Sequence, residues 1–297
     1  MPVAQEKTHL LIAGCGYVGR RLATMCRDDP ECAHLSITGT TGSTGAARAL
    51  QQAGVSAMQL NLDAPVTLPT LTAPWSLLYM VPPHGAHEDT RLSALLAALR
   101  PPLPGRLVYI STSGVYGDYR GRDVNEDSPP RPTTDRAQGR LAAEQQVREW
   151  SQRNAMSWVI LRVPGIYGPG RLPLAGSTQG SPILRAEDCG PGNRIHRDDL
   201  VRCCLAALST GHANRIYNVC DDDHSTSCAF TLEVARQAGL AAPPQIPLAE
   251  AKQTFSAMRL SFLTESRRLD NRRMHEMLGV RLAYPDMASG IAASLAG

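Results

Sequence analysis

HLLIAGCGYVGRRL, residues 9–22, joins a short apolar run to three glycines and then to the start of a helix-like pattern. His9–Ala13 predicts a buried strand, because consecutive apolar residues end abruptly at a glycine. Gly14, Gly16 and Gly19 follow with GxGxxG spacing. The first permits a tight turn, the second lets backbone approach a pyrophosphate, and the third lets a helix pack close to the strand. The segment therefore predicts a dinucleotide-binding loop.

The composition is that of an ordinary soluble enzyme. The chain has 297 residues, of which 43% are hydrophobic and 19% charged, and its net charge is +3. No basic stripe interleaved with aromatic residues is present, which argues against a nucleic-acid partner. The N-terminal sequence lacks a signal-peptide pattern and no apolar run approaches about 18 residues. We therefore expect a cytoplasmic protein with no membrane partner.

The eight cysteines include no CxxC pair and no histidine at metal-ligand spacing. We therefore expect reduced, mostly buried thiols and no metal site.

Strand and helix patterns alternate through the first half of the chain. Further strands are predicted at Leu35–Gly39, Ser56–Leu60, Trp75–Val81, Arg106–Ser111 and Trp158–Val163. Helices are predicted at Ala46–Gln52, Arg91–Leu99 and Ala137–Trp150. This alternation predicts an α/β fold, a doubly wound parallel sheet with helices on both faces and ligands beyond the carboxyl ends of the strands.

The second half of the chain has a different residue composition and pattern. Residues 165–182, dense in glycine and proline, predict a long loop rather than a packed element. A helix is expected over Asp198–Leu208, with Asp198 as its N-cap and Asp199 as a first-turn acid. Ile216–Val219 predicts one more strand, and a helix-rich tail starts at Thr231–Ala238. Asp221–Asp223 is interpreted as a solvated loop rather than a metal site.

The loop after the second strand bears on the choice of cofactor. An NAD-selective site normally has an acid there to hold the ribose 2′-hydroxyl, but Gly39–Thr44 contains no carboxylate. This favours NADP, with NAD as the alternative. Arg20 and Arg48 are candidate partners for a 2′-phosphate, and the hydroxyls of Thr41 and Ser43 are lesser donors.

Two further loops are expected beside the cofactor. Asp63, after the third strand, either contacts adenine or is an ordinary turn residue. Pro82 follows the fourth strand, where a rigid proline shapes the nicotinamide side without donating a hydrogen bond. His84 and His87 in the same loop are expected to be solvated. Tyr17 and Val18, within the glycine motif, complete the expected cofactor contacts.

Motifs along nearly the whole chain carry a resemblance to a known family. They are STSGVYGD at 111–118, ILRVPGIYGPG at 160–170, RIHRDDL at 194–200, IYNVCDD at 216–222 and SRRLDNRRMHEMLGV at 266–280. In this order they resemble the extended short-chain dehydrogenase/reductase family, the NAD-dependent epimerase/dehydratases. The GxGxxG form, in place of GxxGxxG, resembles the atypical branch.

The resemblance implies a fold and an activity. It implies a Rossmann domain over 1–164, to which 195–220 returns, and a smaller, mostly helical substrate-binding region formed by 165–194 and 221–297. We expect an NAD(P)-dependent oxidoreductase or epimerase/dehydratase acting on a carbonyl or sugar-nucleotide-like small molecule, with a homodimer as the candidate assembly. The alternative is a catalytically degenerate NADP-binding sensor.

The family's catalytic YxxxK motif is missing. Counting back from Glu144, Arg136 holds the tyrosine position and Arg140 the lysine position. Arginine cannot act as an acid or base at neutral pH because its pKa lies above about 12. Arg140 is expected either to contact the nicotinamide ribose or a phosphate, or to be a solvated helix residue.

Another proton donor is then required for catalysis. Thr112, at the family's Ser/Thr position, is expected either to orient a substrate oxygen or to be a strand-end hydroxyl that bonds backbone. Tyr116 is our candidate donor, with its pKa lowered by a cation such as Arg162, and Tyr167 is the alternative. Both tyrosines have the competing interpretation of packing against the sheet.

Overall fold

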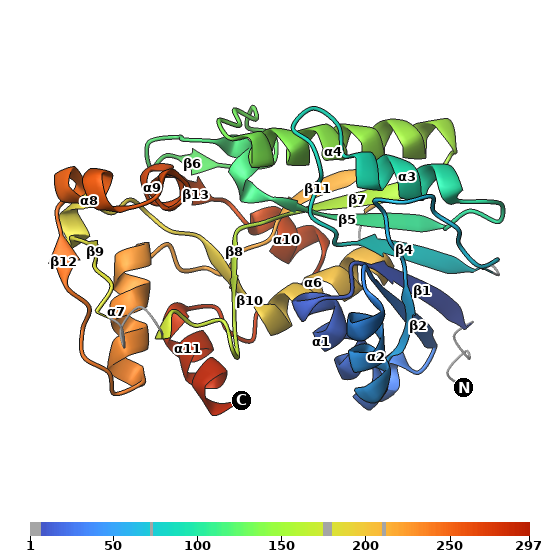
Figure 1. The fold of residues 1–297 in the computed structure, drawn as a ribbon, viewed down its shortest axis with the longest axis horizontal. Coiled ribbons are helices and arrows are strands. Elements are labelled where there is room, and N and C mark those ends of the chain that lie inside the picture. The colour runs from blue at the N-terminus through green and yellow to red at the C-terminus, as the bar shows by residue number, and fades with distance from the viewer. Residues whose placement is uncertain (1–6, 72–73, 175–179, 210–211) are drawn as a thin grey trace.

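The central sheet contains seven parallel strands in the order β11-β7-β5-β4-β1-β2-β3. The computed structural model describes residues 7–71, 74–174, 180–209 and 212–297. The strands are β1 (Thr8–Ala13), β2 (Leu35–Thr41), β3 (Ser56–Gln59), β4 (Trp75–Tyr79), β5 (Arg106–Thr112), β7 (Ser157–Val163) and β11 (Arg215–Asn218). Figure 1 shows this sheet with helices packed along it. The predicted doubly wound α/β fold is confirmed.

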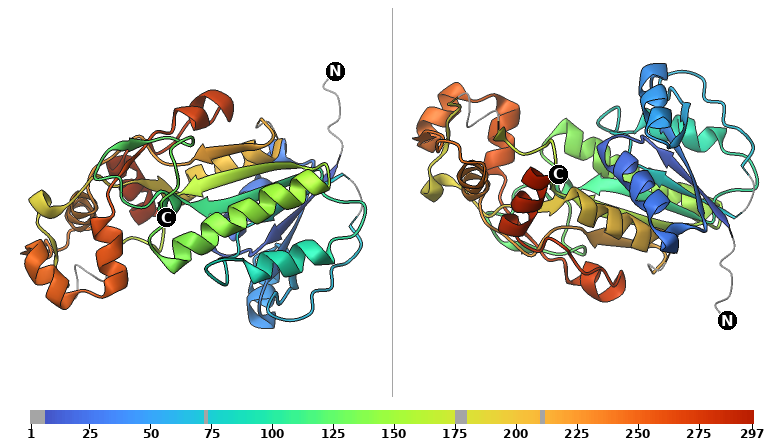
Figure 2. Two further views of the ribbon diagram at one scale, coloured as in Figure 1. Left: turned by 90° about the horizontal axis from the view of Figure 1, so that it is seen from above. Right: turned by 90° about the horizontal axis from the view of Figure 1, so that it is seen from below.

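Helices cover both faces of the sheet (Figure 2). They are α1 (Tyr17–Asp28), α2 (Thr44–Gln52), α3 (Thr90–Ala98), α4 (Asp135–Arg153) and α6 (Arg197–Ser209). Side chains alternate along β1, so Leu10 and Ile12 share a core with α1 and α6, whereas Leu11 and Ala13 share one with α3 and α4. This two-sided burial explains the continuous apolar run in the sequence.

Smaller elements extend from the carboxyl ends of the strands. Three short parallel pairs join β8 (Gly165–Tyr167) to β10 (Arg194–His196), β9 (Ile183–Leu184) to β12 (Gln245–Ile246), and β6 (Asp123–Val124) to β13 (Arg268–Leu269). The later helices are α7 (Ser227–Gln237), α8 (Leu248–Thr254), α9 (Ala257–Thr264), α10 (Arg272–Met277) and α11 (Met287–Ala296), and short 3₁₀ turns lie at Pro30–Cys32, Ser113–Tyr116 and Ala186–Asp188. We call β9, β12, α7, α8 and α9 the small lobe, which lies at the left of Figure 1.

Two features differ from the sequence-based expectation. The stretch after Pro164 is not all loop, because β8 pairs with β10. The segment containing α10 also returns to the main sheet, where Met274, Leu278 and Val280 enter the core shared with α1 and α6. The C-terminal region therefore contributes to the Rossmann core as well as to the lobe beyond it.

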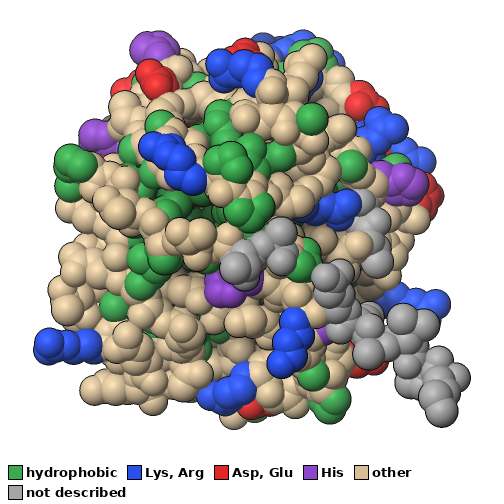
Figure 3. Space-filling model, turned by 90° about the vertical axis from the view of Figure 1, so that its right-hand side faces the viewer, with side chains coloured by type: hydrophobic (Ala, Val, Ile, Leu, Met, Phe, Trp, Pro, Cys, Tyr) green, Lys and Arg blue, Asp and Glu red, His purple; other side chains and the backbone are tan. Residues whose placement is uncertain are grey.

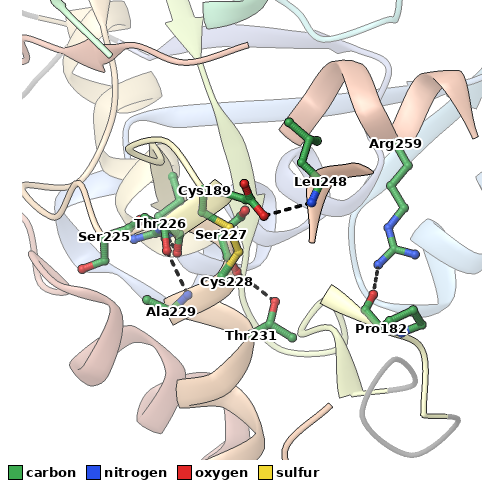
Figure 4. The surroundings of a disulfide bond; sticks show 12 residues. Pro182, Cys189, Ser225, Thr226, Ser227, Cys228, Ala229, Thr231, Leu248 and Arg259 are labelled. Carbon is green, nitrogen blue, oxygen red and sulfur yellow. Dashed lines mark hydrogen bonds between the residues drawn. A yellow bond between two sulfur atoms is a disulfide. The ribbon is translucent and has the colours of Figure 1, made fainter. Parts of the chain in front are cut away.

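One cysteine pair corrects the expectation of uniformly reduced thiols. Cys189 and Cys228, 39 residues apart, form a disulfide between the segment leading to β10 and helix α7 of the small lobe (Figure 4). The other six cysteines are free, and all but Cys32 are buried. The pairing depends on how β9 and α7 pack, which sequence spacing does not reveal.

Candidate functional site

The candidate site lies where the order of the parallel strands reverses, between β1 and β4. Gly14 ends β1 with a φ of +83°, and a Cβ there would lie 3.0 Å from the Val81 amide nitrogen and 3.2 Å from the Met80 carbonyl carbon. Glycine is therefore required at position 14 by backbone conformation and by the neighbouring chain.

The other two glycines have different surroundings. A Cβ on Gly19 would lie 3.1 Å from Ile12 Cγ2 and 3.3 Å from Cys15 Sγ, so this glycine lets α1 approach β1. Gly16 is exposed, and a Cβ there would have no contact closer than the Gly14 carbonyl oxygen at 4.0 Å. The packing of the protein explains Gly14 and Gly19 but not Gly16. Gly16 is the N-cap of α1, so the open space beside it fits an anionic group of a dinucleotide.

A loop from the second half of the chain is fastened to this turn. The Tyr17 hydroxyl donates to the Pro169 carbonyl oxygen at 2.9 Å. The guanidinium carbons of Arg171 and Arg197 lie 4.0 and 5.0 Å from the centre of the Tyr17 ring. The sequence motif predicted Tyr17 beside the cofactor, but these two arginines are far away in the chain and were missed.

The cations around the start of α1 outnumber the nearby acids. Asp198 binds Arg21 through two hydrogen bonds of 2.8 and 2.9 Å and also accepts from Arg197 at 3.0 Å. Within the described ranges, no ion pair involves Arg171. Arg20, on the same helix, is exposed. Because one carboxylate lies among several guanidinium groups, the local net charge beside the glycine loop is positive.

The end expected to hold the ribose is built from hydroxyls and exposed backbone. Thr41 Oγ1 donates to the Ser43 carbonyl oxygen at 3.0 Å, and Ser43 Oγ caps α2 by accepting from the Ala46 amide at 3.3 Å. Arg48 is exposed on α2. Asp63 is bound by Arg91 through two contacts of 2.7 Å, which hold the pKa of this carboxyl below its usual value.

The nicotinamide side is formed by the segments after β4 and β5. Pro82 is exposed in the loop after β4, as are His84 and His87. Thr112 ends β5 half-buried, and its Oγ1 accepts from the Gly114 amide at 3.2 Å, so this hydroxyl caps the following turn. Its hydrogen remains available to a ligand oxygen.

Arg140 is buried and is not the solvated helix residue that was one of the two expectations. Its Nη1 donates to the Ile110 carbonyl oxygen at 2.8 Å, to the Tyr109 hydroxyl at 3.1 Å and to the Val81 carbonyl oxygen at 3.4 Å. Its Nε is buried without a hydrogen-bond partner. The guanidinium thus joins the ends of β4 and β5 beside the crevice. Arg136 is exposed on the first turn of α4.

Tyr116 corrects our expectation of a lowered phenol pKa. Its hydroxyl donates to Asn218 Oδ1 at 2.7 Å and the residue is fully buried. Arg162 does lie 4.8 Å from the ring centre, but burial outweighs its charge and raises the pKa of Tyr116 to about 12. This phenol is a structural group and is unsuited to proton transfer at the crevice.

Tyr167 is also packed inside the protein. Its ring makes edge contacts with His196 and Phe230 at centroid distances of 5.4 and 5.2 Å. Its hydroxyl is buried against Gly290 without a hydrogen-bond partner, and burial raises its pKa. The alternative donor is therefore no better placed than Tyr116.

A buried ion pair missed by the sequence analysis lies beneath Thr112. Arg162 binds Glu144 through contacts of 3.0 and 2.7 Å, and the side chains of both are 3% exposed. Ser111 Oγ donates to the same carboxylate at 2.5 Å. These groups join β5, β7 and α4 under the crevice. The signal available in the sequence was a charged residue in an apolar strand, Arg162 within WVILRV.

Asp199 is a first-turn acid of α6, as expected, whereas Asp198 and Asp221 have positions that differ from those expected. Helix α6 begins at Arg197, so Asp198 is a first-turn residue rather than the N-cap. Asp199 is buried and accepts from the Ala283 and Tyr284 amides at 2.9 Å each. Asp221 is buried rather than solvated, and burial raises its pKa to about 8.

The described residues contain neither a metal-binding cluster nor a membrane-spanning helix. No group of three or more His, Cys, Asp or Glu side chains there is arranged to hold a metal ion. Within the same ranges, no helix has the length and apolar character needed to cross a membrane. Figure 3 shows one end of the molecule, where Lys and Arg side chains are scattered among uncharged ones.

Comparisons with known proteins identify relatives of this chain by sequence and by fold. Residues 87–220 match the model of the NAD dependent epimerase/dehydratase family. Protein YeeZ of Escherichia coli K12 is 26% identical over 291 residues, covering 93% of this chain and 96% of its own. A solved protein of unknown function from Silicibacter pomeroyi is 30% identical with a TM-score of 0.83, covering 97% of this chain and 98% of its own.

The fold extends to characterised enzymes at lower identity. UDP-glucose 4-epimerase from Thermotoga maritima, solved with UDP-glucose, has a TM-score of 0.77 at 14% identity and covers 97% of each chain. The chain belongs to the NAD-dependent epimerase/dehydratase family. Solved proteins of this fold include complexes with NAD and with NADPH.

Proposed function

We propose that this protein binds a nicotinamide dinucleotide at the β1–β4 crevice, NADP in preference to NAD. The observation that carries the proposal is Gly16, an exposed glycine whose missing side chain serves no packing contact within the protein. Together with the N-terminus of α1, it offers backbone N–H groups and open space to a pyrophosphate. Arg171 and Arg197 would neutralise the same group from the opposite side.

The preference for NADP rests on the end of β2. The Gly39–Thr44 segment has no carboxylate to repel a 2′-phosphate or to hold a 2′-hydroxyl. Exposed donors lie there instead, in the hydroxyl of Ser43 and the first amides of α2, and Arg48 follows on that helix. Arg20 is the other cation of the proposed cofactor site.

The proposed activity is oxidoreduction or epimerisation of a carbonyl or sugar-nucleotide-like small molecule. A bound dinucleotide would supply hydride exchange. Thr112 would orient a substrate oxygen, and Arg140 would fix the ends of β4 and β5 beside the nicotinamide ring. Because Tyr116 and Tyr167 are both buried, the proton would pass through water rather than through either phenol.

A second candidate function is a dinucleotide sensor without catalysis. The favouring observation is the YxxxK site, where Arg136 and Arg140 replace the acid/base pair and Arg140 is committed to backbone carbonyls. Both candidates require the same glycine loop. Turnover separates them, because a sensor binds the dinucleotide without consuming it.

Calorimetric titration with NADPH and NADH tests the cofactor proposal. We expect measurable binding of both and tighter binding of NADPH; tighter binding of NADH would contradict the preference. Absence of binding by either would refute the proposed function. Consumption of NADPH with any of a panel of carbonyl or nucleotide-sugar compounds then supports the enzyme over the sensor.

A further inference from the structure

The Cys189–Cys228 pair lies at the junction between the small lobe and the segment leading to β10. The two Cα atoms are 6.6 Å apart, a spacing that a disulfide bridges without backbone movement. Cys189 is half-buried, whereas Cys228 lies buried in the first turn of α7. Figure 4 shows the bridge between these segments, beside the start of α8. The bridge therefore joins a half-buried residue of the segment leading to β10 to a buried residue of the first turn of α7.

The small lobe has little hydrophobic core of its own. The buried members of its cluster are Ile183, Leu184, Cys228 and Ala251. Other links across it are the two-residue pairing of β9 with β12 and separate hydrogen bonds, such as Leu248 N to Asp188 Oδ2 at 2.9 Å and Arg259 Nη2 to the Pro182 carbonyl oxygen at 2.6 Å (Figure 4). Units with so few buried apolar side chains depend on crosslinks for their order. Cys228 belongs to this core, so its bond to Cys189 ties the core to the segment leading to β10.

The segment held by Cys189 connects the lobe to the candidate site. The Gly192 amide donates to the His224 carbonyl oxygen at 3.2 Å. Asn193 accepts from the Leu269 amide at 2.8 Å and donates to the Arg267 carbonyl oxygen at 2.9 Å. Arg267 Nη1 in turn donates to the Gly117 carbonyl oxygen at 2.6 Å, on the turn that follows Thr112. The disulfide therefore anchors a run of contacts that ends on the substrate side of the crevice.

We propose that Cys189 and Cys228 form a reversible modification site, oxidised by hydrogen peroxide and reduced by dithiols, which sets the order of the small lobe. On oxidation the two S–H bonds and the peroxide O–O bond break, the S–S bond forms, and the peroxide oxygens leave as two waters. The thiols lose two electrons and the peroxide gains them. A dithiol returns two electrons and two protons by thiol–disulfide exchange.

The two redox states are expected to differ in one part of the molecule. In the reduced state the 189–193 segment and helices α7, α8 and α9 exchange backbone hydrogens faster, because the lobe loses its covalent tie. The glycine loop at residues 14–19 lies in the main sheet and keeps its exchange rates. The assignment of the lobe to the substrate side rests on the proposed function, but the redox chemistry does not.

Peptide mass spectrometry with alkylation, combined with hydrogen exchange, tests the proposal. We expect peroxide to remove two alkylatable thiols, at Cys189 and Cys228, and dithiothreitol to restore both in the folded protein. Exchange in the lobe should rise at least about threefold on reduction. Cys189→Ser should show the faster exchange whether or not peroxide is added. Cys32→Ser, which removes a half-buried thiol elsewhere, should behave as the wild type does.

Three results would overturn the proposal. They are a pair that stays reduced while Cys32 is oxidised, a disulfide that dithiothreitol does not open in the folded protein, and lobe exchange that is equal in both states. Because Cys228 is buried and its replacement endangers folding, Cys189→Ser is the informative variant. NADPH titration of the same samples keeps the proposed function separate: loss of binding in both states refutes that function and leaves the redox result standing.

Discussion

Replacing Gly16 by valine tests the link between the glycine loop and dinucleotide binding. The new side chain would enter space in which its Cβ meets nothing closer than the Gly14 carbonyl oxygen at 4.0 Å. Gly16 is also the N-cap of α1, a position where valine is less favourable than glycine by about 1 kcal/mol. We therefore expect a folded protein that loses no more than about this amount of stability.

The effect on binding should be much larger. A valine at position 16 fills the volume assigned to the pyrophosphate and keeps it away from the amides of α1. We expect the affinities for NADPH and NADH to fall by at least about 100-fold, equivalent to roughly 2.7 kcal/mol. Calorimetric titration measures the affinities, and urea unfolding followed by circular dichroism measures stability.

Two matched variants complete the test. Gly105→Val lies at the amino end of β5, opposite the crevice, and should retain binding, since a Cβ there meets only the Trp75 carbonyl oxygen at 3.8 Å. Gly14→Ala should instead lose stability, by about 1–2 kcal/mol for the positive φ and more for its clash with Val81. Unchanged NADPH affinity in a folded Gly16→Val protein would refute our assignment of the open space.

Four other substitutions, the first with a matched control, test other parts of the structure. Arg171→Ala should weaken NADPH binding about fivefold at low salt and less at high salt. The control is Arg148→Ala, which removes an exposed arginine that lies over the Trp158 ring and should leave NADPH binding unchanged. Equal NADPH affinities of the two variants would exclude Arg171 from the cofactor site. Arg136→Ala should change turnover by less than about tenfold, and a thousandfold loss with folding intact would show an acid/base role at that position. Glu144→Gln should lower the free energy of unfolding by about 3–5 kcal/mol because it leaves the Arg162 charge buried, and a loss below 1 kcal/mol by urea titration would contradict this. Burial raises the pKa of Asp221 to about 8, whereas its pKa in the unfolded chain is near 4, so the stability that its neutral form contributes is complete below about pH 4 and is lost as pH rises towards 8. The free energy of unfolding of Asp221→Asn should therefore rise relative to that of the wild type from pH 5 to pH 8. A difference between the two proteins that does not change with pH would refute the assignment.

The sequence pattern predicted those helices and strands that depend on neighbouring residues in the chain. The apolar run before Gly14 predicted β1, and the structure extends that strand by one residue, to Thr8. Helix α2 begins at Thr44, two residues before the predicted start, because Ser43 caps it. Such boundaries depend on backbone hydrogen bonds that residue type only partly reveals.

The candidate site was harder to predict because its charges come together from distant segments. Arg171 and Arg197 meet Tyr17 only after the chain folds, and Glu144 finds Arg162 on another element. Counting nearby charges suggested a lowered pKa for Tyr116, but the cost of burying the phenolate is larger than the attraction of Arg162. Burial is a tertiary property, so the sequence could not supply the dominant cause.

The return of the chain to the main sheet after β13 limits how the protein can be divided. Met274, Leu278 and Val280 fill the same core as α1, and the buried Asp199 holds the amides of Ala283 and Tyr284. A fragment cut after β11 would expose this apolar surface to water and leave a buried carboxylate without its donors. Proteolytic removal of the last 30 or so residues should therefore abolish nucleotide binding, since the core beneath the glycine loop is completed only when the C-terminal segment packs against it.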